Sequence, residues 1–146
     1  MKLSHWSERD VLEPYSQEQR ATAAPKPEGL WVSVDGARDW EDWCHAEEFR
    51  LLTLRHRFAV TLRDDANVLV LDNLDKLMAL GTLYAEDDAR DRIRWFAVAL
   101  EWQGVIIAPY QWSVRLHPSY SWYYPWDCAS GCIWDVDAIE NVERIA

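Results

Sequence analysis

Ten of the 146 residues are tryptophan, and this is the property that most limits what the chain can fold into. Each indole ring can bury about 150–250 Å², and its N–H group usually needs a hydrogen-bond partner. Ten rings exceed what the core of one small domain needs, so we expect some of them to line a groove. The alternative, in which all ten rings serve packing, stays open at this point.

The length suits a single domain over residues 1–146, because domains commonly hold about 100–200 residues. The net charge of −10 opposes binding to a nucleic-acid backbone unless a local basic patch offsets it. One candidate patch lies in the segment RLLTLRHRFAVTLR and consists of Arg50, Arg55, Arg57, Arg63 and His56. This stripe predicts either a face for an anionic ligand or a solvated strand face, and we favour the solvated face.

Three cysteines are an odd number, and polar and charged residues dominate the first ten positions, unlike a secretory signal. No apolar run reaches the roughly 18 residues of a membrane helix. We therefore expect a soluble cytoplasmic protein with reduced thiols and no membrane contact. Cys128 and Cys132 have the spacing of half a zinc site, but the adjacent Cys44 and His45 do not complete it, so no metal is expected. A nucleophilic pair of Cys128 and His117 has no local support.

The hydrophobic pattern predicts short elements in a mixed order. Strands are expected at 2–7, 29–34, 51–62, 67–72, 104–110 and in two pieces within 130–145, and helices at 37–49, 73–84 and 91–102. Residues 8–28, with three prolines, predict a long loop that is functional or mobile. In the strand at 51–62, His56 falls on the apolar face, where a histidine is more often a core residue than a ligand. This order predicts an α+β domain with a split, largely antiparallel sheet and a few short helices.

Short segments at both ends of the chain resemble motifs of the ADP-ribosyltransferase fold, in the branch of diphtheria toxin and the poly(ADP-ribose) polymerases. LSHWS resembles the first motif, a strand that ends in His, a small or aromatic residue, and Ser or Thr. GLWVS resembles the second motif with Trp31 in the place of a tyrosine, and WEDWC resembles the start of the helix that follows. GCIWDVDAI resembles the strand of the last motif. KPEGLW, APYQW and SWYYPWDCASGCIW are also similar to small transferase-like proteins carried by phages.

The resemblance implies an enzyme that cleaves NAD⁺ and transfers ADP-ribose to a macromolecular acceptor. It implies that His5 holds the adenosine-side ribose and serves catalysis, and that Trp31 and Trp43 stack on nicotinamide, a flat cation that aromatic faces bind well. The cofactor-binding residues that it implies are His5, Ser7, Gly29, Trp31, Ser33 and Trp43. A protein of a host cell is favoured over nucleic acid as the acceptor, because the chain is acidic.

One position departs from the family pattern. The last motif has a glutamate five residues before the aspartate that ends the strand, and this aspartate corresponds to Asp135, so Ser130 stands where the glutamate belongs. Asp127 is the nearest acid and becomes the candidate catalytic residue, although it is equally typical of a turn or cap. Two alternatives follow: a silent module that binds NAD⁺ or a nucleotide like ADP-ribose, and a tryptophan-rich phage inhibitor of a host factor.

Overall fold

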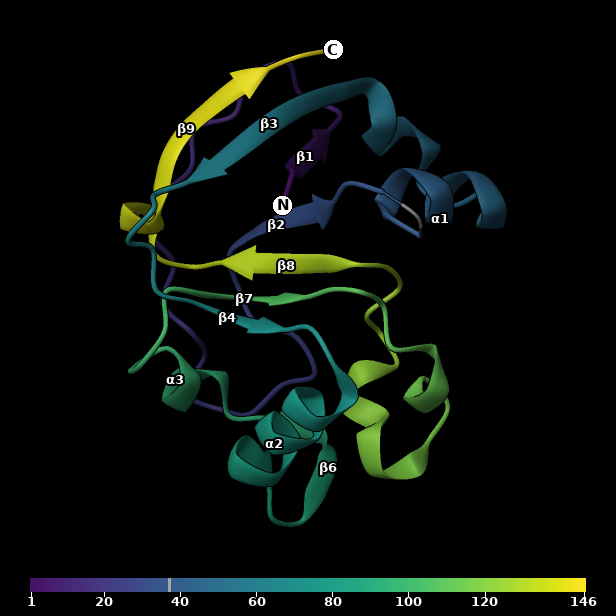
Figure 1. Ribbon diagram of the computed structural model, residues 1–146, viewed down its shortest axis with the longest axis vertical. Coiled ribbons are helices and arrows are strands. Elements are labelled where there is room, and N and C mark those ends of the chain that lie inside the picture. Colours follow the sequence, from purple (N-terminus) through teal and green to yellow (C-terminus); the bar gives the residue numbers. More distant parts are fainter. Residues whose placement is uncertain (37) are drawn as a thin grey trace.

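Within residues 1–36 and 38–146, which the computed structural model describes, seven strands form one curved sheet (Figure 1). In spatial order they are β4 (Val68–Leu71), β7 (Gly104–Ile107), β8 (Ser130–Ile133), β2 (Leu30–Val34), β1 (Leu3–Ser7), β3 (His56–Leu62) and β9 (Ile139–Arg144). All neighbours pair antiparallel except β4 and β7, which are parallel. The predicted α+β class with a largely antiparallel sheet is therefore confirmed.

Short helices and one hairpin surround the sheet. The helices are α1 (Trp40–Glu47), α2 (Leu74–Tyr84) and α3 (Trp95–Val98), with 3₁₀ turns at Leu51–Arg55, Trp112–Val114, Pro118–Tyr123 and Val136–Ala138. The hairpin consists of β5 (Ala85–Glu86) and β6 (Ala89–Ile93). Asp39 caps α1 by accepting from the amide of Asp42, and Asn73 caps α2 by accepting from the amide of Lys76. None of the described helices is both long and apolar enough to cross a bilayer.

Two of the sequence predictions are wrong in part. The strand predicted at 51–62 begins only at His56, because residues 51–55 form a 3₁₀ turn. His56 itself is half-buried, and its Nδ1 lies within hydrogen-bond distance of the guanidinium of Arg144. The helix predicted at 91–102 shrinks to α3, because Ile93 belongs to β6 and its backbone pairs with Ala24. Ala37, where the first predicted helix begins, lies outside the described residues.

The parallel pairing of β4 and β7 is the exception in a sheet predicted to be largely antiparallel. The chain leaves β4, passes through α2, the β5–β6 hairpin and α3, and returns to the same edge of the sheet as β7. The hairpin interrupts the helices between the two strands, so the hydrophobic pattern did not predict a crossover connection here.

The two faces of the sheet carry different cores. One face packs against an aromatic cluster that includes the buried rings of Trp95, Trp122, Trp126 and Trp134. The other face is aliphatic, with residues such as Leu3 and Val32 at its centre. Four of the ten tryptophans are thus fully committed to packing, which leaves others free for a different role.

The sheet opens between β1 and β2. These strands pair at only two positions, Leu3 with Val34 and Ser4 with Ser33, whereas β1 pairs with β3 along its full length from Leu3 to Ser7. A seam between the two strands therefore begins after Ser4, and the candidate site lies there.

We predict that the close approach of β7 and β8 makes Gly131 irreplaceable. A Cβ atom at Gly131 would lie 2.6 Å from the carbonyl oxygen of Val105, so Gly131→Ala should lower the free energy of unfolding by about 1–3 kcal/mol. Gly81 in α2 is the matched control, because its added Cβ would have no neighbour nearer than 3.4 Å. Gly81→Ala should raise stability by about 0.5–1 kcal/mol. Urea unfolding of both variants measures this, and equal shifts would contradict the packing described.

Candidate functional site

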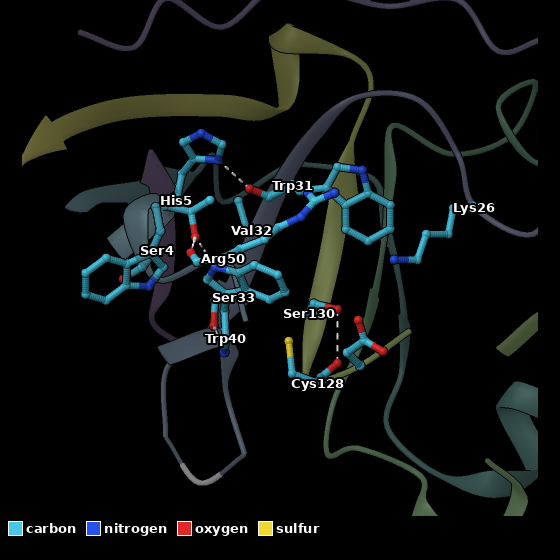
Figure 2. A pocket seen from close by; sticks show the side chains of 13 residues that line it. Ser4, His5, Lys26, Trp31, Val32, Ser33, Trp40, Arg50, Cys128 and Ser130 are labelled. Atoms are coloured by element: carbon cyan, nitrogen blue, oxygen red, sulfur yellow. Dashed lines mark hydrogen bonds between the residues drawn. The ribbon is translucent and has the colours of Figure 1, made fainter. Parts of the chain in front are cut away.

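A pocket with a volume of about 320 Å³ lies at the seam between β1 and β2 (Figure 2). Its walls come from β1, β2, the start of α1, the 3₁₀ turn at 51–55, the long loop and the segment before β8. The lining residues are Ser4, His5, Trp6, Lys26, Trp31, Val32, Ser33, Trp40, Arg50, Thr53, Asp127, Cys128 and Ser130. The volume falls at the lower end of the range for small-molecule sites, about 300–1,000 Å³.

His5 bridges the seam. Its Nδ1 lies 2.6 Å from the carbonyl oxygen of Trp31, and a carbonyl only accepts, so Nδ1 carries the hydrogen and donates it. Burial lowers the pKa of His5 below its ordinary value, although this hydrogen bond acts in the opposite direction. The ring is therefore neutral near pH 7, and its Nε2 keeps a lone pair that can accept a hydrogen bond from a hydroxyl group.

Trp31 connects the pocket to the aromatic core. Its ring makes an edge contact with Trp126 at 4.9 Å between centroids, and the ammonium of Lys26 lies 5.1 Å from its centroid. Burial is the main cause that lowers the pKa of Lys26, opposed most by the negative charge of Asp127. The indole thus already binds one cation, which shows that its face suits a positively charged partner.

Side-chain hydrogen bonds fix the segment from β2 to the 3₁₀ turn. Ser33 Oγ accepts from the amide of Trp40 at 2.9 Å, and Trp40 Nε1 donates to Thr53 Oγ1 at 3.1 Å. These bonds hold the start of α1 and the turn that follows it against β2. Trp40 is therefore the α1 tryptophan that lines the pocket.

Asp127 lines the pocket and forms an ion pair with Arg115 at 3.5 Å. Both side chains are mostly buried, with 24% of the aspartate and 15% of the arginine exposed. Aromatic rings surround the guanidinium, and the nearest of them belong to Trp43 at 5.0 Å and Tyr124 at 5.1 Å. The carboxylate is thus held in a defined position, with part of its charge offset by Arg115.

The cysteines do not provide a nucleophile. Burial raises the pKa of Cys128 to about 12, and burial raises the pKa values of Cys44 and Cys132 as well. The reactive form of cysteine is the thiolate, so these thiols stay inert near pH 7. His117 is exposed and accepts from the amide of Ser119. Among residues 1–36 and 38–146, no group of three potential metal ligands gathers.

The structure brings four of the predicted site residues together. His5, Trp31, Ser33 and Asp127 all line this one pocket, although they come from distant parts of the chain. Ser130, at the position of the family's glutamate, lines it too, but its hydroxyl donates to the carbonyl of Cys128 at 3.0 Å.

The other three predicted residues lie outside the lining. Ser7 ends β1 and its hydroxyl accepts from the amide of Arg9. Gly29 serves packing, because a Cβ there would lie 2.6 Å from the carbonyl oxygen of Ile133. Trp43 lies in α1 outside the lining, and its ring contacts the guanidinium of Arg115.

Sequence reasoning missed several lining residues, above all Ser4, Trp6, Lys26, Trp40 and Thr53. Arg50 belongs to the predicted basic stripe and lines the pocket. Arg57 of the same stripe instead pairs with Asp35 at 2.8 Å. A usable signal was present in KPEGLW, where a lysine precedes the predicted Trp31 by five residues.

Comparisons with protein-family models, curated proteins and solved structures returned no match to this chain. The site is therefore interpreted from its own residues and from the motif resemblance.

We predict that His5 makes the stability of the protein depend on pH. Because the pKa of His5 is lowered on folding, the unfolded chain binds more protons below about pH 6.5, and stability falls as the pH drops through that window. Asparagine can still donate to the Trp31 carbonyl but does not titrate. His5→Asn should therefore lose less stability than the original chain between about pH 7.5 and pH 5. Urea unfolding across this range measures the difference, and parallel curves would refute it.

Proposed function

We propose that the pocket binds NAD⁺ and that the protein transfers ADP-ribose from it to a macromolecular acceptor. The observation that carries the proposal is the meeting of His5, Trp31 and Asp127 in one pocket. The resemblance to the ADP-ribosyltransferase motifs assigns the histidine and the aromatic residue to NAD⁺ and leaves Asp127 as the replacement for the missing glutamate. These three residues are separated by up to 122 positions in the sequence (127 − 5).

The pocket suits two parts of NAD⁺, the nicotinamide ring and a ribose hydroxyl. Nicotinamide in NAD⁺ is a flat cation, and Trp31, Trp6 and Trp40 supply aromatic surface around the pocket. The neutral His5 leaves Nε2 as an acceptor for a ribose hydroxyl. Aromatic walls would orient the nicotinamide, and the imidazole would hold the adenosine-side ribose.

In the proposed reaction the bond between ribose C1′ and the nicotinamide nitrogen breaks, and nicotinamide leaves with the electron pair. The ribose develops cationic, oxocarbenium-like character until the acceptor nucleophile bonds to C1′ and gives up its proton. A fixed carboxylate stabilises such a charge because no solvent has to reorganise around it. Asp127 is the acid that lines the pocket and would provide this field.

The acceptor is proposed to be a protein. The net charge of −10 repels a polyphosphate backbone at long range and does not hinder approach to a neutral or basic protein surface.

A second candidate is a binding module that holds NAD⁺ or a related nucleotide without cleaving it. The ion pair of Asp127 with Arg115 favours this candidate, because the guanidinium offsets the negative charge that the reaction needs. Ser130 at the glutamate position favours it as well, since its hydroxyl is occupied by the Cys128 carbonyl.

We predict that Asp127→Asn lowers the rate of nicotinamide release about 10²–10³-fold while NAD⁺ still binds. Asparagine keeps the shape of the side chain and removes its charge. Nicotinamide release and NAD⁺ affinity should be measured side by side for both proteins. Unchanged turnover would remove Asp127 from the reaction, and binding without turnover in the original chain would select the silent module.

We also predict that Trp31→Ala weakens NAD⁺ binding about 3–30-fold, which corresponds to a stacking contribution of about 0.5–2 kcal/mol. Trp102→Ala is the matched control, because both tryptophans are half-buried against the same aromatic cluster and Trp102 lies outside the pocket. Calorimetric titration measures the affinities and urea unfolding the stabilities. Equal losses of affinity in both variants would make Trp31 a purely structural residue.

A further inference from the structure

We infer that Lys26 and Arg50 form an anion-binding subsite within the pocket, suited to a phosphate or diphosphate group. Both side chains line the pocket, and in Figure 2 both extend toward Trp31. The choice of NAD⁺ as the source of the diphosphate rests on the proposed function, whereas the anion site itself rests only on charge and position.

Neither cation forms a close ion pair among the described residues, and Asp127 acts on Lys26 only at longer range. Among the described residues, the ion pairs are Arg20–Glu28, Arg57–Asp35, Lys76–Asp72 and Arg115–Asp127, and none involves Lys26 or Arg50. Asp127 is the acid in the lining, and Arg115 already binds it. The pocket thus holds two cations against one partly neutralised carboxylate, in a protein whose overall charge is −10.

The two cations also lie close enough to repel each other. The positive charge of Arg50 is among the causes that lower the pKa of Lys26, after the larger effect of burial. Asp127 offsets this repulsion at Lys26, but Arg115 neutralises part of the charge of Asp127, so the like-charge pair is only partly compensated. An anion between the two would remove the repulsion, and it would gain charge-assisted hydrogen bonds with both groups.

Local backbone structure keeps Arg50 at the pocket. Its φ of 47° and ψ of 40° lie in the left-handed region, which costs a non-glycine residue free energy. Thr53 holds this conformation, because its amide and its hydroxyl both donate to the Arg50 carbonyl, at 2.9 and 2.7 Å. Since Thr53 also binds Trp40, the turn that carries Arg50 is fastened to the pocket wall.

The test measures binding of three probes by calorimetry: inorganic pyrophosphate, NAD⁺, and nicotinamide riboside, which has no phosphate. Arg50→Gln and Lys26→Gln should each weaken pyrophosphate and NAD⁺ binding about tenfold or more, as expected for the loss of a charge-assisted hydrogen bond. The affinity for nicotinamide riboside should stay within about twofold. Higher salt should weaken pyrophosphate binding to the original chain and affect nicotinamide riboside much less.

Arg55→Gln is the matched control, because Arg55 is exposed in the same 3₁₀ turn and lies outside the lining. Urea unfolding confirms that each variant is folded, and Arg50→Lys should recover part of the pyrophosphate affinity. If both glutamine variants bind pyrophosphate and NAD⁺ as the original chain does, the anion site is refuted even where nicotinamide release persists. If pyrophosphate binds through Arg50 but NAD⁺ is neither bound nor cleaved, the anion site stands and the proposed function falls.

Discussion

The end of backbone pairing between β1 and β2 is the constraint on which the site depends. After Ser4 the two strands no longer form a ladder, and a sheet with unpaired polar groups in its interior is unstable unless other partners are found. His5 supplies one such partner by donating to the carbonyl of Trp31. The same bond fixes the orientation of the imidazole and leaves space between the strands. A site at the centre of a sheet is possible here because a side chain takes the place of the backbone ladder.

The tryptophans both pack the core and line the pocket. Trp95, Trp122 and Trp126 pack by edge and tilted contacts, with 6.2–6.4 Å between centroids, in a core that has little freedom to rearrange. Trp31 contacts this core with one edge and lines the pocket as well. The aromatic wall of the pocket is therefore part of a rigid assembly. A ligand that contacts Trp31 does not have to order this side chain, so binding loses little side-chain conformational entropy there.

Much of the fold followed from local patterns, since the hydrophobic pattern identified β1, β2, β4 and β7 and the helices α1 and α2. The helix predicted at 91–102 was wrong because of a tertiary contact. Ile93 belongs to a strand because its backbone pairs with Ala24, a contact that no local periodicity contains. The motif resemblance pointed to two residues that line the pocket, His5 and Trp31. Arg50 could not be placed in it, because its location depends on how the 3₁₀ turn packs in the tertiary structure.

The long loop at 8–28 connects the pocket with β6 and α3. Its Ala24 exchanges backbone hydrogen bonds with Ile93, and its carbonyl also accepts from Trp95 Nε1 at 3.0 Å. Lys26 follows two residues later, so its position at the pocket is set from the aromatic core. A state with only the strands around β1 formed would possess His5 and Trp31 but would lack Lys26 at the pocket. The charge of the pocket thus depends in part on the completed tertiary structure.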